Sequence, residues 1–196
     1  MTEPHEPTIR TLDSTTIYTN TWLTLKEDRI QRPDGTHGTY SFLDKTDFAL
    51  VIPMENNGFH LVEEYRYPIG RRTWSFPQGG VPDSPSPQAT AHTELAEETG
   101  LTATHLTHLG HLDNAHGITT QRFDVFLATG LTPGTPHREH TEQDMRQNWF
   151  PRTQLEQMIT NGTITDSCSI AAYTLLLLNP PQRPPTTRDT GKKRVT

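Results

Sequence analysis

The feature that most constrains the fold is a change of pattern near residue 80. Residues 73–77, "TWSFP", have the composition of a strand and end at a corner made by Gln78, Gly79 and Gly80. Beyond it, Ser86-Pro87 predicts an N-cap followed by proline at the first helical position, and Gly100 predicts the residue just past a helix end. The sequence therefore predicts a strand, a glycine corner and a helix in direct succession.

Strand signals dominate the rest of the chain. Residues 21–31 alternate and lead into "RPDG", which predicts a hairpin, and the apolar run "FALVIP" predicts a buried strand. Further strands are expected at 59–68, 106–112, 122–128 and 146–150, and helices at 151–159 and from the N-cap Asp166 to about residue 178. Because tight turns join most strands and helices are inserted singly, the pattern favours an α+β fold with a mixed sheet.

The two ends of the chain differ from its middle. Residues 1–14 are polar and are expected to be flexible, and the tail 179–196 is proline-rich and then basic, which predicts disorder. Residues 15–178 remain as one domain of ordinary length.

Composition excludes several functions. The chain has 17 Lys and Arg against 23 Asp and Glu, a net charge of -6, so nucleic-acid binding is not expected. Its one cysteine, Cys168, suits a reducing cytosol. The longest nearly apolar run, residues 170–178, is far shorter than the roughly 20 residues that span a bilayer. We expect a cytoplasmic protein without a membrane partner.

The expected helix carries an acidic cluster near its end, in "TELAEETG". Glu94, Glu97 and Glu98 fall within an arc of roughly 100° on a helix. Glu94 and Glu98 are four residues apart, so they repel each other unless something neutralises them. A solvated charged face is the usual explanation of such a helix. The glycine corner before it favours another one, because carbonyl and carboxylate oxygens are the ligands that Mg²⁺ prefers.

The stretch from Gly79 to Leu101 resembles the Nudix box, whose pattern is G-x5-E-x7-R-E-U-x-E-E-x-G-U with U a bulky aliphatic residue. Two positions depart from the pattern: Pro85 replaces its first glutamate and Thr93 its arginine. The remaining positions match: Gly79, Glu94, Leu95, Glu97, Glu98, Gly100 and Leu101. The segments "LVEEYRYPIGRRTWSFPQGG" and "WFPRTQLEQMITNGTITDSCSIAAYTLLLL" resemble ADP-ribose pyrophosphatase-like members, so the similarity extends over residues 15–178.

The resemblance implies a Nudix fold, with a mixed β-sheet sandwiched between α-helices, and an activity. Such enzymes cleave the pyrophosphate bond of a nucleoside diphosphate linked to a group X, with water activated by Mg²⁺ or Mn²⁺. ADP-ribose pyrophosphatase-like members are often homodimers, so a homodimer is expected.

The resemblance also assigns roles to residues. The metal ligands would be Glu94, Glu98, Glu97 and the carbonyl of Gln78, with Glu97 also a candidate catalytic residue. The catalytic base would be Glu142, with Glu139 as its rival. The substrate-binding residues would be Arg66, Arg71, Gly79 and Gly80.

The departures from the family pattern leave two alternatives open. Pro85 cannot ligate a metal, and Thr93 cannot pair with the acidic cluster, which favours a catalytically weak ligand-binding or regulatory protein. The three glutamates favour the enzyme. Ser75 stands where a glutamate is common and His116-Gly117 where a proline is common, which weakens ADP-ribose as the substrate without excluding nucleotide sugars. Oxidised nucleoside triphosphates are a further option.

Overall fold

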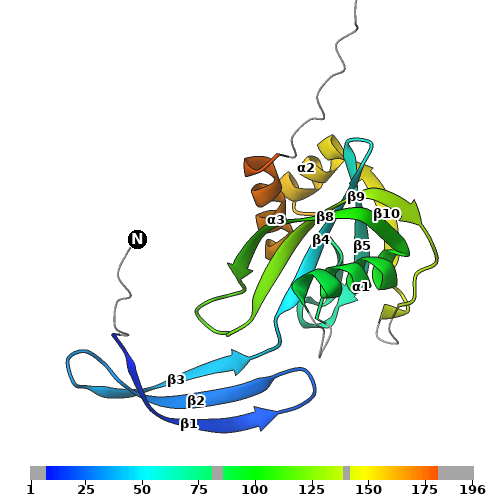
Figure 1. Ribbon diagram of the computed structural model, residues 1–196. Helices are drawn as coiled ribbons and strands as arrows, with labels where there is room; N and C mark the ends of the chain where they lie inside the picture. The colour runs from blue at the N-terminus through cyan, green and yellow to red at the C-terminus, as the bar shows by residue number, and fades with distance from the viewer. Residues whose placement is uncertain (1–7, 81–85, 139–141, 181–196) are drawn as a thin grey trace, which may run out of the picture.

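The computed structural model describes residues 8–80, 86–138 and 142–180. Figure 1 shows a three-stranded sheet that extends away from a larger body of sheet and helices. The small sheet is antiparallel and contains β1 (Arg10–Thr19), β2 (Thr24–Gln31) and β3 (His37–Asp44), in that order. The predicted hairpin turn is confirmed, since Gly35 N donates to Arg32 O at 2.9 Å between β2 and β3.

The expectation of a flexible N-terminus up to residue 14 is wrong for residues 10–14. These residues belong to β1, where Arg10 pairs with Gln31 and Ser14 with Asp28. The sequence of β1 lacks apolar alternation, yet its threonines and Ile17 are β-branched, which favours an extended backbone. Residue 15, where we expected the domain to begin, therefore lies inside β1 rather than before it.

The larger sheet confirms the α+β prediction. Its strands run in the order β10 (Arg146–Pro151), β5 (Gly58–Arg66), β4 (Phe48–Glu55), β9 (Arg122–Pro133) and β8 (Leu101–Asp113). Two short strands complete it: β6 (Arg71–Ser75) pairs with β5, and β7 (Gln78–Gly79) pairs with β4. β4 and β9 are parallel and the other pairs antiparallel, so the sheet is mixed.

Helices cover both faces of this sheet. Ala49 and Val51 of β4 pack with Ala91 and Leu95 of α1 (Pro87–Thr99). The alternate residues of β4 join a cluster with side chains of α2 (Arg152–Thr160) and α3 (Ser167–Leu178) on the opposite face. Because both faces of β4 are buried, its sequence is apolar at nearly every position rather than at every second one.

The ends of α1 follow the local signals in the sequence. Ser86 Oγ accepts a hydrogen bond from Ala89 N at 3.1 Å, and Gly100 adopts φ +72°, the left-handed conformation that glycine tolerates best. These caps place Glu94 and Glu98 in the last two turns. In the part of the chain that the structure describes, none of the helices is long and apolar enough to cross a membrane.

Candidate active site

Two carboxylates of α1 meet the glycine corner. Glu94 and Glu98 are buried, with 7% and 3% of their surfaces exposed. Gln78 N lies 3.3 Å from Glu98 Oε2 and donates to it, while a Cβ added at Gly79 would lie 2.4 Å from Glu94 Oε2. A side chain at residue 79 would therefore displace the Glu94 carboxylate, and no positive φ calls for glycine there. The corner and the acidic helix are packed together, as the strand, corner and helix pattern led us to expect.

Glu98 lies in an environment that opposes its ionisation. Burial raises the pKa of the Glu98 carboxyl well above its usual range, and the nearby carboxylates of Glu94, Glu142 and Glu64 raise it further. The backbone N–H of Gln78 acts in the opposite direction but more weakly. Such a group is stabilised as a carboxylate when a cation lies beside it, because opposite charge offsets the lost hydration.

The donor set fits a divalent cation with few protein ligands. Among the described residues, no group of three or more His, Cys, Asp or Glu side chains is arranged to hold a metal ion. Mg²⁺ usually keeps several waters and takes one or two carboxylates together with substrate phosphates, and the buried pair of Glu94 and Glu98 matches that requirement. Glu97 is half-buried, and its carbonyl accepts from His137 N at 3.0 Å. Its part in metal binding stays a prediction, as does that of the Gln78 carbonyl.

The loop before β10 brings a third acid to this place. Glu142 is close enough to Glu98 to raise the pKa of the Glu98 carboxyl, and its carbonyl accepts from Met145 N at 2.9 Å. Glu139, its rival as the base, lies outside the described residues, as does Pro85. Of the two candidate bases, the structure therefore locates Glu142 alone.

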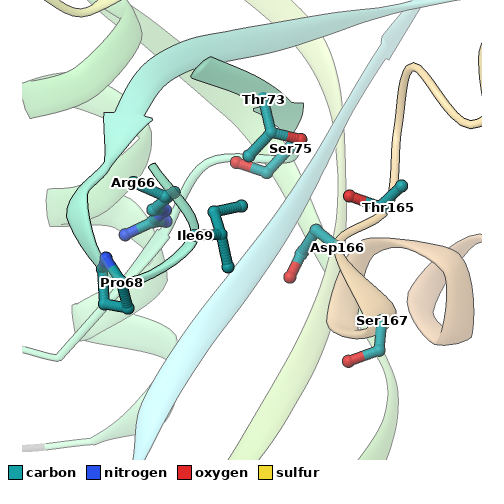
Figure 2. Close-up of a pocket in the computed structure, with 8 residues that line it drawn as sticks. All are labelled: Arg66, Pro68, Ile69, Thr73, Ser75, Thr165, Asp166 and Ser167. Carbon is teal, nitrogen blue, oxygen red and sulfur yellow. The ribbon is translucent and has the colours of Figure 1, made fainter. Parts of the chain in front are cut away.

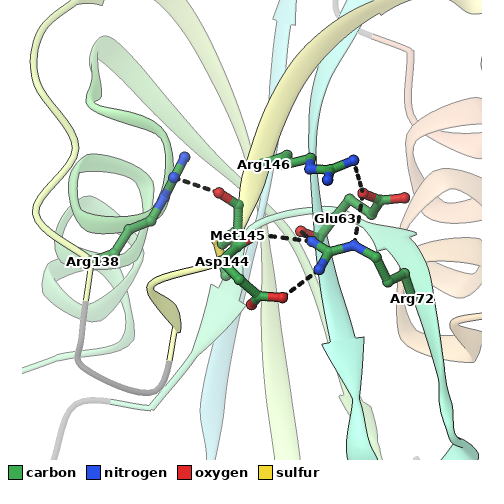
Figure 3. A network of polar contacts seen from close by, with 6 residues as sticks. All are labelled: Glu63, Arg72, Arg138, Asp144, Met145 and Arg146. Carbon is green, nitrogen blue, oxygen red and sulfur yellow. Dashed lines mark hydrogen bonds and ion pairs between the residues drawn. The ribbon is translucent and has the colours of Figure 1, made fainter.

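Two arginines hold this loop, and Figure 3 shows their contacts with Glu63, Asp144 and Met145. Arg72 of β6 bonds Glu63 Oε2 through Nε at 3.0 Å and Asp144 O through Nη2 at 2.9 Å, and it also pairs with the Asp144 carboxylate. Arg138 donates from Nε to Glu98 O at 3.1 Å and from Nη1 to Met145 O at 2.5 Å. Arg138 therefore connects this loop to the backbone of Glu98.

The predicted substrate-binding residues do not all meet at the glycine corner. Arg66 forms an ion pair with Glu64, with 2.6 Å between Nη2 and Oε1, while Arg71 donates from Nη2 to Thr165 Oγ1 at 2.8 Å. A Cβ at Gly80 would lie 2.9 Å from Asp47 O. Arg66, Gly79 and Gly80 thus occupy the neighbourhood of β4, β5 and β7, whereas Arg71 is engaged at the loop before α3.

Sequence reasoning missed Glu64, Arg138 and Asp144. Burial raises the pKa of the Glu64 carboxyl, although Arg66 partly opposes the effect. None of the three belongs to the Nudix-box pattern, and each has other polar residues beside it in the sequence, so nothing in its local sequence distinguishes it. The one available signal was weak: Glu64 and Arg66 are two apart on a strand and therefore share a face.

Comparisons with known proteins identify the family of the chain. Residues 45–172 match the NUDIX domain, and residues 9–43 match the nucleoside diphosphate sugar hydrolase N-terminal domain. An ADP-ribose pyrophosphatase of Mycobacterium tuberculosis is 34% identical over 170 residues, which are 85% of this chain and 82% of the relative. An ADP-ribose pyrophosphatase of Bacillus subtilis is 26% identical over 136 residues, 69% of this chain and 74% of the relative.

A solved structure supports the fold. The crystal structure of an ADP compounds hydrolase superposes with a TM-score of 0.78 at 19% identity, covering 87% of this chain and 92% of that one. The N-terminal match also separates the small sheet from the larger body, a division that the sequence analysis did not make. With a family match over most of its length and a pyrophosphatase relative that spans nearly all of it, the chain belongs to the Nudix family, as one of its pyrophosphohydrolases.

Proposed function

We propose that the protein is a Mg²⁺-dependent pyrophosphatase that cleaves a nucleoside diphosphate linked to X, where X belongs to the ADP-ribose or nucleotide-sugar class. The observation that carries the proposal is the buried pair of Glu94 and Glu98 packed on the Gln78–Gly79 corner. A pyrophosphate is densely negative, so an acidic site binds it only with a cation between them. The relatives named as ADP-ribose pyrophosphatases support this substrate class.

Each residue has a definite part in the proposal. Glu94 and Glu98 hold Mg²⁺, which, when bound, neutralises the diphosphate and lowers the pKa of a water molecule. Glu142 accepts the proton of the attacking water, and Arg72 and Arg138 keep the Glu142 loop beside Glu98. Mn²⁺ has similar oxygen preferences and is the expected substitute.

A substrate panel tests the activity. Purified protein is assayed with ADP-ribose, nucleotide sugars, dinucleotides and oxidised nucleoside triphosphates, with Mg²⁺ or Mn²⁺, and the phosphate products are quantified. We expect Glu98→Gln to lower the metal-dependent rate at least about tenfold, which corresponds to about 1.4 kcal/mol of transition-state stabilisation. Asp113→Asn removes the same charge from an exposed position on β8 and should leave the rate unchanged.

The second candidate is a ligand-binding protein with little turnover. Pro85 and Thr93 favour it, because each removes a polar side chain that the family pattern contains. Tight binding of a nucleoside diphosphate derivative without release of phosphate products would identify this alternative and reject the enzyme.

We also propose that the protein is a homodimer joined through its small sheet. All ten residues of β1 are exposed, and large apolar side chains of this sheet and its turns face solvent, including Tyr18 and Trp22. Large exposed apolar patches are typical of interaction surfaces, and most soluble oligomers consist of copies of one chain. Light scattering after size-exclusion chromatography should give twice the chain mass, and Trp22→Glu should give the monomer. A monomeric wild type would exclude this arrangement.

We propose the cytoplasm as the location of the protein. A single cysteine and a small diphosphate substrate both suit the cytoplasm, where thiols stay reduced.

A further inference from the structure

The start of α3 makes more contacts with the glycine corner than a helix end requires. Figure 2 shows Asp166 at this helix start, across a pocket of about 290 Å³ from Arg66 and Pro68 of the turn after β5. Asp166 is the N-cap of α3, since Asp166 Oδ2 accepts a hydrogen bond from Ser169 N at 2.8 Å. Capping needs no other partner, so a further contact of this carboxylate calls for another explanation.

A second hydrogen bond joins the same carboxylate oxygen to the corner. Gln78 Nε2 donates to Asp166 Oδ2 at 3.1 Å, although the two residues are 88 positions apart. Ser169, which is only 3% exposed, accepts from Phe76 N through its hydroxyl at 2.8 Å. The first turn of α3 therefore holds the chain on both sides of Pro77.

Packing does not account for the side chain of Gln78. Gln78 Oε1 is buried and has no hydrogen-bond partner among the described residues. A buried polar atom without a partner costs stability, and a methionine of similar length would avoid that cost. The hydrogen bond with Asp166 is therefore the property that distinguishes Gln78 from an apolar residue at this position.

The backbone of Gln78 carries this restraint to the acidic pair. Gln78 N donates to Glu98 Oε2 at 3.3 Å, which is longer than usual for such a bond, so a small shift of the corner would break it. Val51 N donates to Pro77 O at 2.9 Å, so β4 restrains the residue before Gln78 as well. With its side chain held by α3, Gln78 has little freedom to turn its N–H away from Glu98.

We propose that Asp166 is a positioning residue of the acidic site. It acts through the side chain of Gln78, and the Gln78 N–H in turn orients the Glu98 carboxylate that would hold the divalent cation. This inference rests on the proposed function and adds to the site a residue outside the Nudix-box pattern.

Three substitutions separate the contact with Gln78 from the capping of α3. Asp166→Ser keeps an N-cap of similar strength but is too short to reach Gln78, whereas Asp166→Asn keeps an acceptor oxygen for both donors. Gln78→Met removes the donor. For Asp166→Ser and Gln78→Met we expect the Kd for Mn²⁺, measured by electron paramagnetic resonance without substrate, to rise about three- to tenfold, the value of one lost hydrogen bond. Asp166→Asn should rescue the affinity to within about twofold.

Hydrogen exchange in the metal-free protein measures the geometry of the corner directly. In Asp166→Ser, NMR should show the amide of residue 78 exchanging about three- to tenfold faster, because its bond to Glu98 opens more often. Leu127 N–H, in a buried part of the large sheet, should keep its rate within about twofold. A merely structural role for Asp166 would speed both amides by the same factor and would overturn the inference. Gln154→Met makes the same side-chain change at an exposed position on α2 and should alter neither the exchange rates nor the Kd.

Kinetics and a double variant complete the test. For the best substrate of the panel, kcat should fall by the same factor as the Mn²⁺ affinity, with KM within about twofold. Gln78→Met combined with Asp166→Ser should lose no more than either variant alone, because both remove one hydrogen bond.

The inference is overturned if the two effects multiply, if Asp166→Asn loses as much as Asp166→Ser, or if the Kd for Mn²⁺ does not change. If wild type neither binds Mn²⁺ nor cleaves a nucleoside diphosphate derivative, the proposed function fails by itself. The exchange rate at residue 78 then decides whether Asp166 positions the corner, because that measurement needs neither metal nor substrate.

Discussion

Gly79→Ala should place a methyl group directly on a candidate metal ligand. The added Cβ would lie 2.4 Å from Glu94 Oε2 and 2.6 Å from its Cδ and Oε1. These separations are about 1 Å shorter than ordinary van der Waals contacts, so the Glu94 carboxylate must shift. Because Glu94 is buried, this overpacking costs about 1–3 kcal/mol. For a chain of this length, 1 kcal/mol lowers the melting temperature by about 2–4 °C. We therefore expect a loss of about 2–12 °C in metal-free protein and at least a tenfold loss of Mg²⁺-dependent hydrolysis.

A double-mutant cycle separates this contact from other causes. In a Glu94→Ala background the clashing atoms are gone, so Gly79→Ala should then cost less than about 0.5 kcal/mol. Differential scanning fluorimetry of the four proteins measures the coupling. Gly117→Ala is the control, because a Cβ there meets no described atom within 4 Å. The reasoning is refuted if Gly79→Ala costs the same with and without the Glu94 side chain, or if it keeps full activity.

Three further predictions follow from neighbouring groups. Glu98→Gln should melt at a higher temperature than wild type in EDTA at pH 7–8, and the gap should close toward pH 4. Because the pKa of the Glu98 carboxyl is raised, wild type loses stability as pH rises through that pKa, whereas Gln cannot ionise. Fluorimetry across pH that shows no gap contradicts this. Arg138→Met should lower kcat about tenfold with little change in KM, since displacing a catalytic group by 1 Å can cost about a hundredfold; steady-state kinetics decides. Burial raises the pKa of Cys168 to about 11, so iodoacetamide at pH 8 should label this thiol only after unfolding, as mass spectrometry can verify.

The sequence predicted those parts of the site whose signals are local. The N-cap at Ser86 and the glycine at Gly100 bound α1 because capping depends on residues within one turn of each end. These two signals therefore predicted the position of Glu94 and Glu98 within the helix. The apolar run of β4 likewise predicted a buried strand, since both of its faces contact helices.

The rest depends on contacts between segments far apart in the chain. Arg72 and Asp144 are separated by 72 positions and meet because β10 and β6 both pair with β5. Nothing in either local sequence marks that contact. The first ten residues of the small sheet, β1, were not fully predicted for another reason. Both faces of β1 are exposed, so its sequence lacks the alternation of apolar and polar residues by which strands are recognised.

Arg138 shows how a distant contact supplies a positive charge that α1 itself lacks. The last turn of α1 contains no basic residue, so its C-terminal carbonyls lack a cation from the helix itself. Arg138, which is 40 positions beyond Glu98, donates to the Glu98 carbonyl and supplies a positive charge at the helix end that the macrodipole favours. Because the same guanidinium holds Met145 O, the charge at the acidic helix and the position of the Glu142 loop depend on one side chain. Arg138 therefore joins the end of the acidic helix to the Glu142 loop, a link that a residue within α1 would not make.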